Sequence, residues 1–361
     1  MKKILVIASL IPEGGISSWL EKVLGALKED IQFHLISNTV SLRLQKSGLL
    51  DHKNITCQTA PVVSLKKVLG VPQISSALSR VKPAKLLCLD IFPAFSAALA
   101  RSVSFHKPPM VIVVPGIAEN FSRQLSWKSR IVRSLLCLLL KKQDSFIAVS
   151  PAVLDHLKST CLRRFRQQMV PNGIELPAAG IVPLKQDTNF KHIAFLGRLS
   201  YEKGPDIFLA IANSLKNQPL KFHVIAEGPM LYSLIEYVKK HELLDQVVFH
   251  GHVDNVLPIL AGMDALLVTS RTEGLPYSAL EAMSCNVPVL SLNVGGMPYL
   301  LQEGRNGVLC KDTAEMVTAI NRHIVNDSNE LAVLAKNARD FVEHELSLEK
   351  MAERYRDLLN G

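Results

Sequence analysis

The stretch SRTEGLPYSALEAM, residues 270–283, is the most informative segment of this chain. It follows a short apolar run at 265–268 and changes from a loop to a segment of helical period at Pro276. Proline is favoured in the first turn of a helix, and a buried strand followed by a loop and a helix is part of a βαβ unit. The stretch therefore predicts a parallel sheet whose strands alternate with helices.

The same alternation occurs in both halves of the chain. In the first half we expect strands at 4–8, 33–37, 85–89, 111–114 and 146–149, and helices at 17–28, 95–101, 128–141 and 152–157. In the second half we expect strands at 193–196, 222–226, 247–249, 265–268 and 287–291, and helices at 206–216, 230–241, 258–262, 277–283 and 314–325. A last helical stretch is interrupted near Ser347. The pattern predicts an α/β protein of two Rossmann-like, doubly wound domains that face a central cleft.

The domain boundaries follow from a stretch rich in proline and glycine near residues 171–185. We place an N-terminal domain at 1–172, a linker at 173–185 and a C-terminal domain at 186–345. The helix at about 346–361 is expected to pack back on the N-terminal domain. A length of 361 residues is sufficient for about two domains.

Composition excludes several classes of protein. With 48% hydrophobic and 20% charged residues, the chain is neither disordered nor collagen-like, and no run of about 20 uncharged apolar residues could span a bilayer. The six cysteines have no close partner in the sequence, so neither a zinc cluster nor a disulfide framework is predicted. We expect a soluble or peripheral protein of the reducing cytoplasm. A secretory leader at the N-terminus is the less favoured alternative, because the apolar run ends in PEGG without a cleavage pattern.

The net charge of +9 is divided unevenly along the chain. Residues 1–185 contain 25 Lys+Arg and 10 Asp+Glu, a net +15, whereas residues 186–361 contain 16 and 22, a net −6. The first half is therefore expected to meet an anionic partner, either nucleic acid or an acidic membrane surface. Basic and aromatic residues are not interleaved, which disfavours nucleic acid.

Two carboxylates of the quoted stretch, Glu273 in the loop and Glu281 on the helix, are eight residues apart. The backbone amides from Leu275 onward suit a phosphate, because the start of a helix attracts anions. The two carboxylates could then accept hydrogen bonds from hydroxyl groups on either side of that phosphate, as in a bound sugar nucleotide. The alternative is that Glu273 caps the helix and that Glu281 is a solvated helix residue.

Two cations follow the strand expected at 193–196. Arg198 and Lys203 are five residues apart in the loop GRLSYEKGPD, residues 197–206. The guanidinium of an arginine and the ammonium of a lysine can stabilise a diphosphate that gains negative charge as it leaves. The alternative is that both are solvated cations of a loop. The glycine turn at Gly14 and Gly15 permits a close approach to phosphate, but the absence of a G-x-G-x-x-G motif disfavours dinucleotide binding.

With these residues in place, the chain resembles the family 4 retaining glycosyltransferases, which have the GT-B architecture of two Rossmann domains. The resemblance covers nearly the whole chain and is strongest from Phe146 onward. The carboxylate pair matches the E-x7-E signature of the family. The other matching motifs are AVS at 148–150, VPNGI at 170–174, GRL at 197–199 with KG at 203–204, EGP at 227–229, VFHG at 248–251, and NVPV at 286–289 leading to GG at 295–296.

The resemblance implies a nucleotide-sugar donor, UDP- or GDP-linked, held mainly by the C-terminal domain. By analogy, Arg198 and Lys203 would stabilise the departing diphosphate, Glu273 would hold sugar hydroxyls, and Glu281 would bind the ribose. The family retains anomeric configuration by front-face attack, with the leaving phosphate as base. No cofactor or metal is expected, because the two cations neutralise the leaving group.

Backbone groups of the C-terminal domain would complete the donor site, and Gly15 of the N-terminal domain would approach the diphosphate. The backbone groups are those of Gly274, Leu275 and Pro276. The chain departs from the family at Pro115 and Gly116, where many members have a histidine near the donor sugar. Gly116 and Asp90 are therefore candidates for the acceptor and sugar side, although Asp90 could equally cap the following segment.

The basic stretch 121–142 combines cations with apolar residues. One interpretation is an interfacial helix at an acidic membrane that Trp127, Lys128, Arg130 and Arg133 would face. The other is an ordinary Rossmann helix with its cations in water. The excess charge of the first half favours the membrane.

We therefore predict a cytoplasmic, peripheral hexosyltransferase that moves a sugar to a hydroxyl of a lipid-linked, lipopolysaccharide or polysaccharide acceptor. Two alternatives stay open: a sugar-nucleotide 2-epimerase, and a non-catalytic membrane-bound partner subunit of the same fold. Neither the sugar nor the oligomeric state follows from the sequence.

Overall fold

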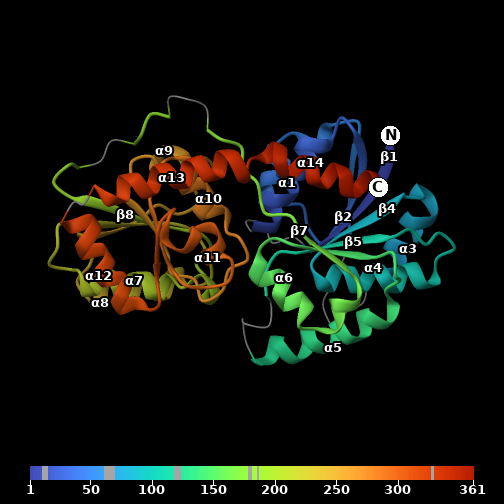
Figure 1. The fold of residues 1–361 in the computed structure, drawn as a ribbon, viewed down its shortest axis with the longest axis horizontal. Helices are drawn as coiled ribbons and strands as arrows, with labels where there is room; N and C mark the ends of the chain where they lie inside the picture. Colours follow the sequence, from blue (N-terminus) through green and yellow to red (C-terminus); the bar gives the residue numbers. More distant parts are fainter. Residues whose placement is uncertain (10–14, 61–69, 118–122, 178–180, 185–186, 327–328) are drawn as a thin grey trace. The chain divides into compact units, whose positions relative to one another are not determined.

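The computed structural model describes residues 1–9, 15–60, 70–117, 123–177, 181–184, 187–326 and 329–361, except for the side chains of residues 123–129 and 303. It divides the chain into two compact units (Figure 1). Unit 1 contains Met1–Asn172 and Leu348–Gly361, and unit 2 contains Gly173–Ser347. No helix of the described residues is both long and apolar enough to cross a membrane.

Unit 1 is built on a seven-stranded parallel sheet of order β3-β2-β1-β4-β5-β6-β7. In that order the strands are Ile55–Thr59, Ile31–Ser37, Lys2–Ala8, Lys85–Leu89, Met110–Val114, Ser145–Ala148 and Arg166–Met169. The helices are α1 (Gly15–Leu27), α2 (Leu42–Lys46), α3 (Val71–Val81), α4 (Ile91–Val103), α5 (Arg123–Leu139), α6 (Pro151–Lys158) and α14 (Leu348–Asn360), with short 3-10 turns at Leu49–Asp51 and Cys161–Arg164.

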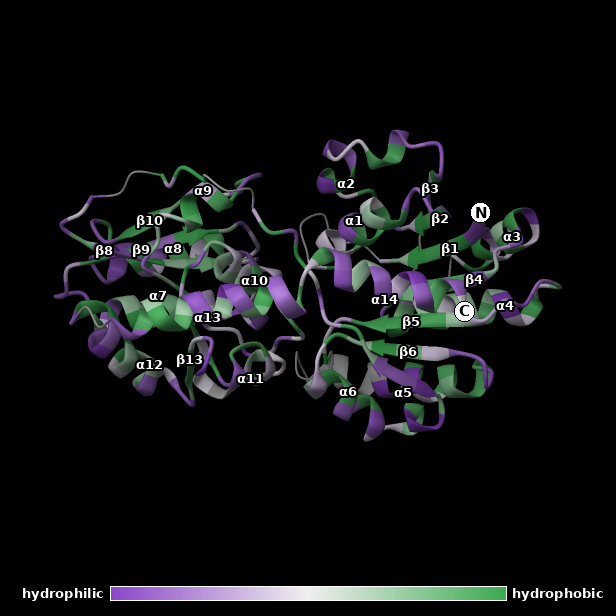
Figure 2. Ribbon diagram, turned by 45° about the horizontal axis from the view of Figure 1, so that its top comes forward, coloured by the Kyte–Doolittle hydropathy of each residue, from purple (hydrophilic) through white to green (hydrophobic). Residues whose placement is uncertain are grey.

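The central strands of unit 1 are apolar on both faces, as expected of a parallel sheet covered by helices. Every residue of β5 is buried, and β1 is buried from Ile4 onward. Apolar residues are concentrated in these strands (Figure 2). Helix α14 packs on α1 through an edge-on contact between Trp19 and Tyr355, with ring centroids 5.1 Å apart.

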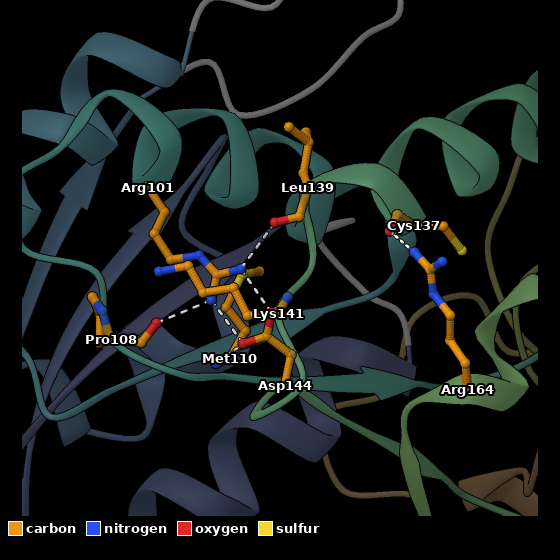
Figure 3. Close-up of polar contacts among 8 residues, drawn as sticks. All are labelled: Arg101, Pro108, Met110, Cys137, Leu139, Lys141, Asp144 and Arg164. Atoms are coloured by element: carbon orange, nitrogen blue, oxygen red, sulfur yellow. Dashed lines mark hydrogen bonds and ion pairs between the residues drawn. The ribbon is translucent and has the colours of Figure 1, made fainter.

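A buried ion pair links α4 to the turn between α5 and β6 (Figure 3). The two terminal guanidinium nitrogens of Arg101, Nη1 and Nη2, donate to Oδ1 and Oδ2 of Asp144, each at 2.7 Å. Arg101 also donates to the carbonyls of Pro108 and Leu139, while Asp144 accepts from the amides of Met110 and Lys141. The pair thus fixes the loops that precede β5 and β6.

Unit 2 is built on a six-stranded parallel sheet of order β10-β9-β8-β11-β12-β13. In that order the strands are Val247–Phe249, Leu220–Ile225, Lys191–Leu196, Ala265–Val268, Val289–Leu292 and Val308–Cys310. The helices are α7 (Pro205–Ser214), α8 (Leu231–Lys240), α9 (Leu257–Leu260), α10 (Tyr277–Ser284), α11 (Met297–Leu300), α12 (Thr313–Ile320) and α13 (Glu330–Glu345), with 3-10 turns at Tyr201–Lys203 and Gln302–Gly304 and a π-helix at Asn321–Val325.

One face of the unit 2 sheet packs against an aromatic core, in which Phe208 lies between Phe195 and Phe222. Three histidines form a hydrogen-bonded row in the same unit. The rings of His192 and His223 are joined by nitrogens 2.9 Å apart, and those of His223 and His250 by a second 2.9 Å contact. Burial above all lowers the pKa of His223, to about 4, and the neighbouring His250, His192 and Lys221 lower it further.

Several expected elements differ from the structure. The sequence analysis missed β3, β7, β13, α2, α3 and α11, and it expected α5 to begin at residue 128 and α12 to continue through 325 as one helix. Strands β3 and β7 lie at the two edges of their sheet, and their polar residues lack the apolar pattern of a buried strand. The interruption at Ser347 separates α13 from α14.

Candidate functional site

The candidate site of unit 2 is built from the loops that follow β8, β9, β11 and β12. These strands are parallel neighbours, so their C-terminal ends lie at one edge of the sheet. Arg198 follows β8, Lys203 ends the 3-10 turn Tyr201–Lys203, and Glu273 lies between β11 and α10. Ligands of open parallel sheets bind at this edge.

Lys203 and Glu273 contact each other directly. The Lys203 ammonium donates to both carboxylate oxygens of Glu273, at 2.7 and 2.9 Å, and the Ser270 hydroxyl donates to Oε1 at 2.6 Å. The Glu273 side chain is 6% exposed and that of Lys203 is 30% exposed. The sequence analysis assigned the two residues separate ligand groups and did not predict this pair.

The pair retains capacity for a ligand. A lysine ammonium has three N–H donors, and two of them are directed to Glu273. Each carboxylate oxygen has two lone pairs, so Oε2, which accepts from Lys203, can accept once more. Arg198 is partly buried, and its guanidinium has no hydrogen-bond or ion-pair partner within the described part of the chain. The site therefore presents two cations and one acceptor to any anionic, hydroxyl-bearing molecule.

Two glycines bring the loops together. Gly204 has φ +65°, and a Cβ at this position would lie 2.1 Å from the Thr269 carbonyl oxygen. Gly295 has φ +53°, and a Cβ there would lie 1.8 Å from the Glu273 carbonyl oxygen. Because only glycine fits such contacts, these residues fix the loops after β8 and β12 against the loop that carries Glu273.

Arg271 holds the same loops together, and the sequence analysis did not single it out. Its guanidinium donates to both carboxylate oxygens of Asp206, at 2.9 and 2.6 Å, and to the Tyr201 carbonyl at 2.7 Å. It also lies over the Tyr201 ring, 3.9 Å from the centroid. The hydrogen bond from Arg271 lowers the pKa of Asp206 below its usual value. Arg271 thereby fixes the turn that carries Lys203.

Helix α10 begins immediately after Pro276, which is its N-cap residue and not part of its first turn. The first amide bonded within this helix is that of Leu280, to the Pro276 carbonyl. Gly274 and Leu275 are buried, and Glu281 lies partly buried on the helix. The start of α10 therefore lies at the same sheet edge as Glu273, and helix starts favour anions.

The candidate residues of unit 1 lie at the C-terminal ends of β1, β4 and β5, at one edge of that sheet. Gly15 is the exposed first residue of α1, with open space where a Cβ would be. Asp90 has φ +82°, and its carboxylate accepts from the Ile91 amide at 2.6 Å, at the N-cap of α4. Burial raises the pKa of Asp90. Gly116 lies partly buried just beyond β5.

The predicted membrane-facing residues belong to α5. The side chains of Trp127 and Lys128 lie outside the described residues, whereas Arg130 is exposed and Arg133 partly exposed. Ile131 and Leu135 of this helix are also exposed. Within the described ranges no group of three or more His, Cys, Asp or Glu side chains could hold a metal ion.

Comparison with known proteins identifies the domain that carries the site. Residues 181–341 match the model of the family described as Glycosyl transferases group 1. This range includes Arg198, Lys203, Glu273 and Glu281. The match supports a glycosyltransferase.

Two curated relatives and one solved structure extend this comparison. The chain is 28% identical over 246 residues to a glycogen synthase of Mycobacterium tuberculosis, an alignment that covers 65% of this chain and 59% of the synthase. The chain thus spans about three fifths of the length of that relative. It is 22% identical over 273 residues to a lipopolysaccharide 1,6-galactosyltransferase of Escherichia coli, which covers 73% of this chain and 72% of the relative.

The solved structure is the Anabaena protein HepE in complex with UDP and glucose. It has a TM-score of 0.81 and 18% identity, and it covers all of both chains. This likeness concerns the fold, and it confirms the expected GT-B architecture of two Rossmann-like domains.

Proposed function

We propose that the chain is a retaining hexosyltransferase that moves a sugar from a UDP- or GDP-linked donor to a hydroxyl of a lipid-linked, lipopolysaccharide or polysaccharide acceptor. The observation that carries this proposal is the contact between Lys203 and Glu273, at the same edge of the sheet where Arg198 follows β8. It lies inside the domain that matches the glycosyltransferase family. The lipopolysaccharide relative supports the envelope-type acceptor.

In this proposal Arg198 and Lys203 bind the diphosphate of the donor. Negative charge grows on the leaving phosphate as the glycosidic bond breaks, and preorganised cations stabilise that charge without reorganisation. Lys203 can direct its third N–H to the phosphate while it keeps Glu273 in place. The amides at the start of α10, after Gly274, Leu275 and Pro276, add further donors. Two such cations allow transfer without a metal ion.

The carboxylates hold the donor on either side of its phosphates. Oε2 of Glu273 accepts from a hydroxyl of the sugar, and Glu281, just over one turn along α10, accepts from the ribose. The acceptor hydroxyl attacks the anomeric carbon on the face from which the diphosphate leaves and gives its proton to a phosphate oxygen. This front-face attack retains the anomeric configuration. Gly15 of unit 1 remains a candidate for the donor diphosphate, and Asp90 and Gly116 remain candidates for the acceptor and sugar side.

The activity can be tested with a panel of UDP- and GDP-sugars, each incubated with and without extracted lipid-linked glycans. We expect one donor to release its nucleoside diphosphate only when an acceptor is present, in saturating EDTA, with an unchanged anomeric configuration in the product. A new nucleotide sugar formed without acceptor would instead indicate an epimerase. Donor binding without turnover for any acceptor would indicate a non-catalytic subunit.

Action at the cytoplasmic face of a membrane belongs to the same proposal. Exposed Arg130, with Ile131 and Leu135 on the same helix, supports an interfacial role for α5. Replacement of Arg130 and Arg133 by glutamine should then weaken co-sedimentation with vesicles of phosphatidylglycerol. Equal binding of parent and variant would assign these residues to a solvated helix.

A further inference from the structure

Two cysteines that are far apart in the sequence meet in unit 1. Cys137 lies in the last turn of α5, and Cys161 is the first residue of the 3-10 turn Cys161–Arg164, which precedes β7. Their thiols share a hydrogen bond. The sequence analysis predicted no cysteine pair, because β6 and α6 lie between the two positions along the chain and only the fold brings them together.

The two segments are held together by contacts other than those of the thiols. The Arg164 guanidinium donates to the Cys137 carbonyl (Figure 3), and it lies over the Phe165 ring, 4.9 Å from the centroid. The Cys161 thiol donates to the Arg133 carbonyl, one turn earlier in α5, at 3.9 Å. The native fold therefore keeps the two sulfur atoms next to each other.

The two thiols differ in their access to solvent. Cys161 is exposed, whereas Cys137 is 5% exposed. Burial above all raises the pKa of Cys137 to about 12, and the hydrogen bond with Cys161 adds to the rise. The charges of Arg164 and Arg133 lower it but do not offset burial. Because oxidants react with a thiolate and not with a thiol, Cys137 is inert toward them at neutral pH. Cys161 is the thiol of the pair that a small oxidant can reach.

An accessible thiol next to a second thiol is the arrangement in which oxidation ends in a reversible disulfide. The exposed Cys57 provides a contrast within the same unit, because its thiol contacts the hydroxyl of Ser37, which cannot form a disulfide. Disulfides of cytosolic proteins in mesophiles are mostly transient, and many of them sense oxidants. The pair of Cys137 and Cys161 fits this class of site.

We propose that Cys161 and Cys137 form a reversible oxidation site, in which a hydroperoxide oxidises Cys161 and Cys137 converts the product to a disulfide. With hydrogen peroxide, the Cys161 sulfur attacks one oxygen, the O–O bond breaks, and a sulfenic acid and one water are formed. The Cys137 sulfur then attacks the Cys161 sulfur. The S–O bond breaks, and the hydroxyl group leaves with the Cys137 proton as a second water. The two thiols thus lose two electrons and two protons, and the peroxide is reduced to two waters.

The disulfide joins α5 to the turn before β7 and closes a loop that contains β6 and α6. Loop closure removes conformational entropy from the unfolded chain, so the oxidised form of unit 1 should unfold at a higher urea concentration than the reduced form. Because Cys161 is exposed, a dithiol reductant can reach the bond and reverse it by thiol–disulfide exchange. The site is independent of the transferase activity.

The test oxidises the reduced full chain with hydrogen peroxide, blocks the remaining thiols with N-ethylmaleimide in denaturant, and maps the tryptic peptides by mass spectrometry without reduction. Cleavage after lysine and arginine places Cys137 in peptide 134–141 and Cys161 in peptide 159–163. We expect these peptides to be joined, with a mass two hydrogens below the sum of the reduced peptides, and to separate after dithiothreitol. The urea midpoint, followed by tryptophan fluorescence, should rise on oxidation and return on reduction.

Substitutions assign the two roles. Cys161→Ser should abolish the joined peptides and leave Cys137 as a thiol that N-ethylmaleimide labels after unfolding. When dimedone is present to capture sulfenic acid, its adduct on Cys161 should be about tenfold more abundant in Cys137→Ala than in the parent, because the fold holds the second thiol in place for attack. The control Cys57→Ser removes another exposed thiol and should give the same joined peptides as the parent.

Three results would overturn the proposal. The first is peroxide treatment that oxidises Cys57 but joins no peptides in the parent. The second is equal dimedone capture on Cys161 in the parent and in Cys137→Ala. The third is a urea midpoint that falls on oxidation, which would show that the bond forms only in a distorted fold. The peptide map of the parent requires no change at the buried Cys137, so the test does not depend on the folding of a variant.

Discussion

The substitution Asp144→Asn tests how strongly one buried ion pair stabilises unit 1. Asp144 is fully buried, Arg101 is 1% exposed, and the two are joined by two hydrogen bonds of 2.7 Å. Asparagine removes the negative charge and leaves the Arg101 charge buried without compensation. Loss of one partner of such a pair costs about 3–5 kcal/mol, a large part of the roughly 5–15 kcal/mol that stabilises a typical domain.

The assay is urea unfolding followed by tryptophan fluorescence. Both tryptophans of the chain, Trp19 and Trp127, belong to unit 1, so their emission reports on that unit. We expect the midpoint of Asp144→Asn to fall sharply. The control Asp155→Asn removes an exposed carboxylate that pairs with Lys158 at 3.6 Å, and it should cost under about 1 kcal/mol.

A double-mutant cycle separates the ion pair from other effects of the substitution. The double variant Arg101→Met, Asp144→Asn leaves no uncompensated charge. Its free energy of unfolding should therefore fall by about 2–3 kcal/mol less than the sum of the decreases in the two single variants. If Asp144→Asn unfolded within 1 kcal/mol of the parent, or if the two losses were additive, the argument for a stabilising pair would be refuted.

Two further predictions concern the site and the histidine row of unit 2. Lys203→Met and Glu273→Gln should each lower transfer by about 10²–10³-fold, because each removes a preorganised contact to the donor, and steady-state kinetics with circular dichroism would show activity lost in a folded protein. Parent-like activity in either variant would remove that residue from the site. The pKa of His223 is about 4 in the folded state against 6.5 for an ordinary histidine, so the unfolded chain binds a proton first as pH falls. Stability is therefore complete above about pH 6.5 and should decline by about 2 kcal/mol between pH 7 and 5, whereas His223→Gln should show a flatter urea-unfolding profile over that range. An equally steep decline in the variant would show that other groups cause the acid sensitivity.

The sequence predicts the buried strands well and the polar edge strands poorly. Strands such as Met110–Val114 are continuous apolar runs, because helices cover both of their faces. Strand β7 reads Arg-Gln-Gln-Met and lies at the sheet edge, so its pairing with β6 leaves no hydrophobic pattern in the sequence. The sequence predicts Pro276 in the first turn of its helix, whereas in the structure it is the N-cap residue that directly precedes Tyr277.

The candidate residues of unit 2 could be found from their motifs, but their mutual contacts could not. Lys203 and Glu273 are 70 residues apart, and they meet because β8 and β11 are neighbours in the sheet. Arg271 and Asp206 meet for the same reason, because they follow β11 and β8. Asp206 directly follows Gly204 and Pro205, and nothing in that sequence predicts its contact with Arg271.

The number of cations in the first half can be read from the sequence, but their positions in the folded unit cannot. The excess of cations before residue 185 is visible by counting, and it favours an anionic partner for the first half. Where these cations lie in the folded unit is not visible by counting, because the strand order of the sheet cannot be read from the sequence.

Calorimetric titration of UDP- and GDP-sugars into the full chain tests the central claim, that the edge of the unit 2 sheet binds a nucleotide-sugar donor. We predict saturable binding of one donor by the parent and by the control Lys216→Ala. Arg198→Ala should bind it at least tenfold more weakly, because a charge-assisted contact to phosphate is worth about 1.5–3 kcal/mol. Equal affinity in Arg198→Ala and the parent, or no binding of any donor in the panel, would contradict the claim.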